Sequence, residues 1–157
     1  MRRCYAPPEL ISHATATPHE KHTLTVFYPP GTPPKDGWPV ILHSGAGNFL
    51  ATDPLDALVA APSGTADLYN ACKHGWCVIS VGTTGLFSTG SDYPNLFRDY
   101  GTAEWEDFSK YWGEKEFVWA RQWVAESQDV LGVDNNLVVP WGVSTGAIYG
   151  ASIALGP

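Results

Sequence analysis

The chain has 157 residues, of which 44% are hydrophobic and 16% are charged, and its formal net charge is −7. This length suits one domain with a core of its own, and the composition excludes a disordered chain. The acidic balance, with no cluster of lysine and arginine, argues against nucleic acid as a partner. No stretch approaches the roughly 20 apolar residues of a membrane span, and Arg2-Arg3 is not followed by the apolar run of a signal peptide. We therefore expect a protein without a membrane span and, by default, a cytoplasmic one.

Neither the cysteines nor the N-terminal histidines have the spacing of a metal site or of a disulfide framework. The chain has three cysteines: Cys4, Cys72 and Cys77. Their number and separations fit small apolar residues better than metal ligands. Three histidines lie in or beside the segment 1–20, which is rich in Pro, Ala and Thr: His13, His19 and His22. We expect no metal site and no organic cofactor.

In chain order, the first regular elements are two strands. Residues 1–20 show no sustained period and are predicted to be irregular. Residues 22–28 alternate polar and apolar side chains, which indicates a strand. After a turn rich in Pro and Gly, the apolar run 38–43 is typical of a strand covered on both faces.

A helix and a third strand follow. Residues 65–74 predict a short helix that ends at Gly75, and residues 76–81 predict another buried strand. The loop at 82–101 is rich in glycine and long enough to be functional. Its aromatic side chains either line a pocket or pack against the domain, and the sequence leaves both alternatives open.

The main helical region is predicted at 103–131, where Gly113 divides it into two helices. An apolar stripe recurs along it at helical spacing and is assigned to the core: Trp105, Phe108, Trp112, Trp119 and Trp123. Strands that alternate with helices in this way predict a parallel sheet with right-handed crossovers.

The pattern Gly-x-Ser-x-Gly occurs at Gly142-Val143-Ser144-Thr145-Gly146. A predicted turn at 132–136 and an apolar strand at 137–139 precede it, and an apolar stretch at 147–155, suited to a helix against a sheet, follows it. A hydrolytic serine sits on a strand-to-helix turn so sharp that the residues two before and two after it must be small. The N–H groups that begin the helix then point at the serine.

These elements predict one α/β domain over residues 1–157. We expect a three-layer sandwich, with a mostly parallel sheet of about four to five strands and helices on both faces.

Three segments of the chain, in this order, resemble the N-terminal half of an α/β-hydrolase of the esterase/lipase, carboxylesterase-like, type. Residues 43–47 are similar to the His-Gly-Gly-Gly oxyanion loop of those enzymes, although Ser44 and Ala46 replace two glycines. Residues 119–124, followed by residues 131–134, are similar to the helix and turn before the nucleophile elbow, and residues 141–146 are similar to the elbow itself. The resemblance covers most of residues 22–157.

The resemblance implies a carboxylic ester hydrolase that acts on a small-molecule ester. Ser144 would be the nucleophile, and Gly142 and Gly146 would form the elbow around it. The backbone N–H of Thr145 would be one oxyanion donor, with N–H groups of Gly45 and Ala46 as the others. The strand before the glycine loop would lie beside the strand before the elbow. Residues 45–47 also fit a plain tight turn, and His43 fits a structural role better than that of a general base.

One departure from the family concerns the catalytic triad. The family orders it Ser, then Asp or Glu, then His, but residues 145–157 contain none of these partners and all five histidines precede Ser144. We therefore expect a fold truncated just after the elbow, with the strands that carry the acid and the histidine missing, and little or no esterase activity in this chain. An alternative has His43 or His74 serving Ser144 from the other side.

Two other functions are considered. A non-catalytic, hydrolase-like binding or interaction module would not need the acid and the histidine. A nucleotide-binding domain is disfavoured because residues 45–50 lack the last glycine of the dinucleotide fingerprint and the loop at Gly142 has no lysine. The strand before the elbow would have an open edge, so we also expect self-association through that edge.

Overall fold

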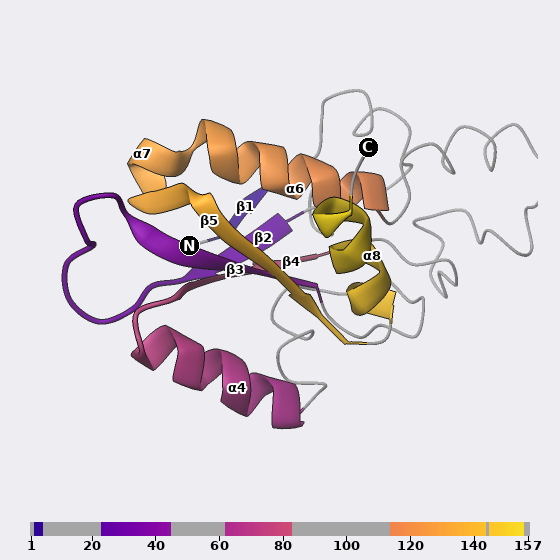
Figure 1. Cartoon of the computed structure of the whole chain (residues 1–157), viewed down its shortest axis with the longest axis horizontal. Coiled ribbons are helices and arrows are strands. Elements are labelled where there is room, and N and C mark those ends of the chain that lie inside the picture. The colour runs from indigo at the N-terminus through magenta and orange to yellow at the C-terminus, as the bar shows by residue number, and fades with distance from the viewer. Residues whose placement is uncertain (1, 5–22, 45–61, 83–113, 144, 156–157) are drawn as a thin grey trace, which may run out of the picture.

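The computed structural model describes residues 2–4, 23–44, 62–82, 114–143 and 145–155 (Figure 1). The strands form one five-stranded sheet in the order β1-β2-β4-β3-β5. They are β1 (Arg2–Cys4), β2 (Thr23–Phe27), β3 (Trp38–Ser44), β4 (Cys77–Val81) and β5 (Val133–Gly142). The helices are α4 (Pro62–Lys73), α6 (Glu114–Glu126), α7 (Gln128–Leu131) and α8 (Thr145–Ala154). In this part of the chain, no helix is long and apolar enough to cross a membrane.

The sheet is mostly parallel. β3 pairs in parallel with β4 on one side and with β5 on the other. β2 is antiparallel to both of its neighbours, β1 and β4, so four of the five strands run in the same direction. The carboxyl ends of β3, β4 and β5 therefore meet at one edge of the sheet, where loops of α/β folds commonly form sites.

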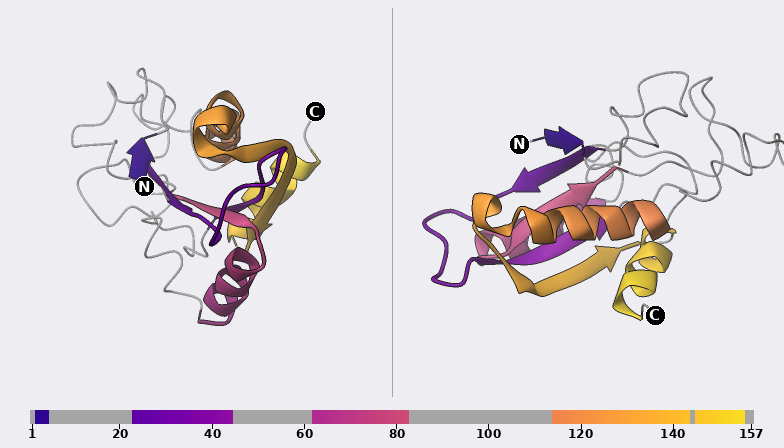
Figure 2. Two further views of the ribbon diagram at one scale, coloured as in Figure 1. Left: turned by 90° about the vertical axis from the view of Figure 1, so that its left-hand side faces the viewer. Right: turned by 90° about the horizontal axis from the view of Figure 1, so that it is seen from above.

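Helices cover both faces of the sheet (Figures 1 and 2). Because side chains alternate along a strand, Leu42 and Ile79 lie on one face, where they share a cluster with Phe117 of α6 and residues of α8. Ile41 and Val78 lie on the other face and pack on α4. We call these the α8 face and the α4 face. The predicted three-layer α/β sandwich is confirmed.

A glycine joins the amino ends of β3 and β5. Gly37 has a φ of 93°, and a Cβ atom there would lie 2.4 Å from the carbonyl carbon of Val133. The next residue, Trp38, donates its N–H to the carbonyl oxygen of Gly132 at 2.9 Å. The chain therefore has room for no side chain at position 37.

The structure corrects two predicted boundaries. Residues 2–4, expected to be irregular, form β1, because so short a strand is defined by its pairing with β2 and not by a pattern of its own. Residues 133–136, expected to be a turn, belong to β5. The register with β3 shifts here, and Arg121 of α6 donates to the carbonyl oxygen of Asn135 at 3.0 Å, which holds this polar segment extended.

The tryptophan stripe is also corrected within the described residues. Trp119 and Trp123 are only half-buried and pack at the margin of the core. The fully buried face of α6 consists of Phe117, Ala120 and Val124. Phe117 is the one large side chain of this face, and the smaller Ala120 and Val124 beside it let the helix approach the sheet closely.

Candidate active site

The candidate site begins where β3 and β5 end side by side. In the parallel register, His43 is opposite Trp141 and Ser44 is opposite Gly142. The described parts of β3 and β5 therefore end at neighbouring positions of the sheet. The predicted adjacency of these two strands is confirmed.

The turn from β5 into α8 is closed by two glycines. The N–H of Gly146 donates to the carbonyl oxygen of Val143 at 3.0 Å. A Cβ atom on Gly142 would lie 2.2 Å from the carbonyl carbon of Gly146 and 2.3 Å from its oxygen, distances that real Cβ atoms do not show. Only glycine at position 142 lets the strand and the helix approach so closely. These two residues are the glycines of the Gly-x-Ser-x-Gly pattern.

The other predicted site residues lie at or beyond the limits of the described structure. Thr145 is the first residue of α8, in the turn whose N–H groups have no intrahelical acceptor. Ser144, Gly45 and Ala46 lie outside the described residues. The assignments of nucleophile and oxyanion donors thus remain predictions.

His43 is buried on the face of the sheet opposite α8. It follows Ile41 by two residues and therefore shares the α4 face, as does Ser80, which follows Val78. The two side chains are paired in the β3–β4 register, with 3.1 Å between His43 Nδ1 and Ser80 Oγ. Burial lowers the pKa of His43 to about 4, so the ring is neutral at pH 7. This placement favours the structural role over that of a base for a serine beside α8.

His74 lies farther than His43 from the carboxyl ends of β3 and β5, where the candidate site is. It follows the last residue of α4, Lys73, and precedes the first residue of β4, Cys77. It is therefore at the amino end of β4, whereas Gly142 is at the carboxyl end of the parallel strand β5. The expected alternative of a histidine acting from the other side has no support from either residue.

Two buried hydroxyl groups at this edge could not be singled out as functional from sequence. Ser80 stands in an apolar run and is identified only by its contact with His43. Ser44 was noted only as the replacement of a glycine. Its side chain is fully buried on the α8 face, opposite Gly142, and its Oγ atom has no hydrogen-bond partner among the described residues.

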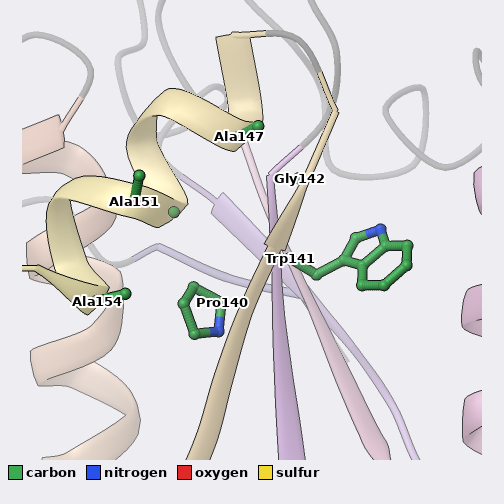
Figure 3. A pocket seen from close by; sticks show the side chains of 7 residues that line it. Pro140, Trp141, Gly142, Ala147, Ala151 and Ala154 are labelled. Atoms are coloured by element: carbon green, nitrogen blue, oxygen red, sulfur yellow. The ribbon is translucent and has the colours of Figure 1, made fainter.

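A shallow apolar groove of about 300 Å³ runs between β5 and α8 (Figure 3). Small residues of α8 face the end of β5 across it: Ala147, Gly150, Ala151 and Ala154 against Pro140 and Gly142. Among the described residues, no titratable side chain lines it, so this part of the chain offers apolar contact there and no acid–base chemistry.

The described part of the chain brings together no group of three or more His, Cys, Asp or Glu side chains that could hold a metal ion. Cys72 and Cys77 are free thiols at the end of α4 and the start of β4. Burial, followed by the nearby Cys72, raises the pKa of Cys77 to about 12. It is therefore a protonated, apolar core residue at neutral pH.

No model of a protein family and no curated protein matches the chain. Solved structures of esterases do. A butyrate-bound thermophilic esterase from the Planctomycetes species Thermogutta terrifontis is 18% identical with a TM-score of 0.52, over 83% of this chain and 38% of that one. A truncated carbohydrate esterase from gut microbiota is 17% identical with a TM-score of 0.55, over 88% and 39%. Brefeldin A esterase, a bacterial homologue of human hormone-sensitive lipase, is 20% identical with a TM-score of 0.55, over 85% and 30%.

The chain thus spans 38% of the length of the first of these esterases, and the identities are at a level that establishes the fold alone. The order of the elements, the mostly parallel sheet and the tight turn into α8 agree with that likeness. The predicted resemblance is confirmed at the level of fold: the described elements are arranged as in the amino-terminal part of these α/β esterase structures.

Proposed function

We propose that the chain supplies the nucleophile and the oxyanion hole of a carboxylic ester hydrolase. Ser144 is the nucleophile, and the backbone N–H groups of Thr145, Gly45 and Ala46 bind the oxyanion. The observation that carries the proposal is the contact between Gly142 and Gly146, which leaves no room for a side chain at a strand-to-helix turn around a serine. The likeness to esterase structures supports the ester as substrate class.

In the proposed reaction, the Oγ atom of Ser144 forms a bond to the carbonyl carbon of the ester, and the carbonyl electron pair moves to oxygen. Backbone N–H groups at the start of α8, where the helix dipole is positive, stabilise that oxyanion. The proton of Ser144 Oγ passes to a general base, the oxyanion collapses with cleavage of the C–O bond of the ester, and the alcohol leaves with that proton. Water then attacks the acyl-enzyme, which releases the carboxylic acid and returns a proton to Ser144. Because the oxyanion donors are backbone groups, an alanine at position 46 is compatible with the role.

The proposed reaction needs a base and an acid that residues 145–157 do not provide, since they contain no Asp, Glu or His. His43 is held on the α4 face by Ser80. We therefore expect the 157-residue chain alone to have little or no esterase activity, with the acid and the histidine supplied by further polypeptide.

The test compares the longest polypeptide that the gene encodes with its Ser144→Ala variant on p-nitrophenyl butyrate, a short ester chosen because one esterase structure holds butyrate. We expect loss of Ser144 to reduce kcat/KM by roughly 10³-fold or more. Ser127→Ala, at a half-buried serine between α6 and α7, is the matched control and should change little. Equal turnover by the Ser144→Ala variant would refute the proposal.

The second candidate is a non-catalytic, hydrolase-like binding module. It is favoured by the histidine that is sequestered on the α4 face. Sequencing beyond the codon for Pro157 separates the two. A further coding stretch with an Asp or Glu and then a His supports the esterase, whereas a stop codon favours the module.

A further inference from the structure

The Ser44 hydroxyl is a polar group that the packing of the chain does not explain. Its side chain is 0% exposed, and its Oγ atom has no hydrogen-bond partner among the described residues. Burying a hydroxyl without a partner costs free energy. A glycine, which the similar oxyanion loops have at this position, would avoid that cost. A buried group of this kind therefore calls for an explanation other than packing.

Ser44 is covered by the chain itself, so its lack of a partner does not come from an open edge of the sheet. β3 is an inner strand, and the register sets Ser44 between Val81 of β4 and Gly142 of β5. Its side chain shares the α8 face with Leu42, two residues earlier, and Leu42 and Val81 both belong to the apolar cluster on that face. Polypeptide added at the edge of β5 would lie one strand farther out.

Ser44 is next to both halves of the proposed oxyanion site. Gly45, one of the proposed N–H donors, follows it directly in the chain. Across the β3–β5 pair, Ser44 is opposite Gly142, which comes two residues before Ser144. The first turn of α8 is close at this point, because a Cβ atom on Gly142 would lie 2.7 Å from the backbone nitrogen of Ala147 (Figure 3).

We propose that the Ser44 hydroxyl takes part in ester hydrolysis as a side-chain dipole, which turns its O–H toward the oxyanion as negative charge develops there. The inference rests on the proposed function and adds a side-chain group to its backbone donors. A hydroxyl that no partner holds is free to rotate about its C–O bond. Its neighbours on the α8 face are apolar, so its interaction with a nearby charge is screened less than in water.

The hydroxyl does not contact the substrate, because its side chain is fully covered. In the resting protein it has no charge to face, so its favourable interaction exists only in the transition state, where it lowers the barrier. The proposal therefore gives opposite signs for stability and activity. Ser44→Ala should slightly raise the urea midpoint of unfolding, and it should lower kcat and kcat/KM together by about tenfold with little change in KM.

Ser44→Thr separates the hydroxyl from the packing of the side chain. It keeps the O–H group and adds a methyl group. If the hydroxyl matters, kcat of Ser44→Thr should stay closer to that of the parent than kcat of Ser44→Ala does. If only packing matters, the larger threonine should disturb the site more than the smaller alanine, which is the opposite order.

Thr25→Val is the matched control. The Oγ1 atom of Thr25 is also buried without a partner among the described residues, but it is on β2. Thr25 precedes Phe27 by two residues and therefore lies on the α4 face, away from α8. Its replacement by valine should leave kcat unchanged. A loss of kcat equal to that of Ser44→Ala would mean that position at the carboxyl end of β3 is irrelevant, and it would overturn the inference.

The measurements use the longest polypeptide that the gene encodes, p-nitrophenyl butyrate as substrate and Ser144→Ala as the reference. An inactive Ser144→Ala variant, together with the expected losses at position 44, supports the inference. If Ser144→Ala is inactive but kcat of Ser44→Ala is unchanged, or Ser44→Thr loses more than Ser44→Ala, this inference fails and the proposed function stands. A parent polypeptide without turnover, or equal turnover by Ser144→Ala, overturns the proposed function and this inference with it.

Discussion

Both ends of the β3–β5 pair have a glycine in close contact with a neighbouring backbone, but the surroundings of the two glycines differ. At the amino end, a Cβ atom on Gly37 would lie 2.4 Å from the backbone of Val133. At the carboxyl end, a Cβ atom on Gly142 would lie 2.2 Å from the backbone of Gly146. Gly37 also has a positive φ of 93°, which strains any other residue. At Gly142, the close approach of Gly146 is the one reason that a side chain does not fit.

What distinguishes the carboxyl end is buried polarity. His43 and Ser80 are paired on the α4 face, and Ser44 is buried on the α8 face without a partner. Burying polar groups costs free energy unless hydrogen bonds compensate it. The amino end also holds polar groups, but its half-buried Arg121 is paired with Asn135. The difference is therefore the buried Ser44 hydroxyl, which has no hydrogen-bond partner among the described residues.

Gly37→Ala should have the largest effect. It combines the strain of a positive φ, about 1–2 kcal/mol, with a backbone clash of roughly 1–3 kcal/mol. Urea unfolding should show a loss of about 3–4 kcal/mol, a large part of the stability of an ordinary domain. Gly31→Ala isolates the strain, because Gly31 has a φ of 99° but nothing within 4 Å of the added Cβ. If Gly37→Ala and Gly31→Ala lose similar amounts of stability, the added Cβ at position 37 does not clash with the backbone of Val133.

Gly142→Ala should cost roughly 1–3 kcal/mol, since strand and helix must separate to admit the methyl group. Under the proposed function, it should also lower kcat of the full-length gene product more than KM changes, because the displaced turn carries Ser144. Gly150→Ala is the control within α8: its Cβ would lie 3.4 Å from Pro140, and replacing a helical glycine gains about 0.5–1 kcal/mol. A destabilised Gly150→Ala variant would show that the whole of α8 is intolerant.

His43 should make the stability of the chain depend on pH. Its pKa is about 4 in the folded chain and 6.5 when unfolded, so the unfolded chain binds the extra proton between those values. The stability that comes from the neutral His43 ring is fully present above pH 6.5. It is lost as pH falls toward 4, which lowers the free energy of unfolding by about 3 kcal/mol in all. Urea unfolding between pH 7 and pH 4.5 should therefore show a steeper decline for the parent chain than for His43→Gln. If the stability of both proteins declines equally with pH, the His43 ring is exposed to water and the inference of burial is wrong.

Much of the fold was predictable because local chemistry decides it. The apolar run of β3 and the glycine after α4 need no partner to be recognised, and the structure has both elements. β1 was missed because three residues carry no period. Residues 133–136 of β5 were read as a turn because Asp134 and its two asparagines favour turns, whereas the pairing with β3 and the bond from Arg121 keep them extended.

The candidate site was predictable as a pattern and not as a geometry. The spacing of Gly142 and Gly146 in the sequence predicts the tight turn that the structure contains. The pairing of His43 with Ser80 joins residues 37 positions apart and depends on the β3–β4 register, which no local pattern encodes. The same register places His43 on the α4 face. His43 is therefore not positioned to act as a base for a serine beside α8.

Ser44→Ala should have the smallest effect, and an opposite sign. The Oγ atom is fully buried and unpartnered, so removing it relieves a desolvation cost of about 1–3 kcal/mol. Because the deletion also leaves a small cavity, urea unfolding of the 157-residue chain should show a net gain of less than about 1 kcal/mol. Ser127→Ala, at a half-buried serine, should stay within about 0.5 kcal/mol of the parent chain. A loss on Ser44→Ala would mean that the hydroxyl is bound in solution, and the carboxyl end would then hold a satisfied polar network on both faces of the sheet.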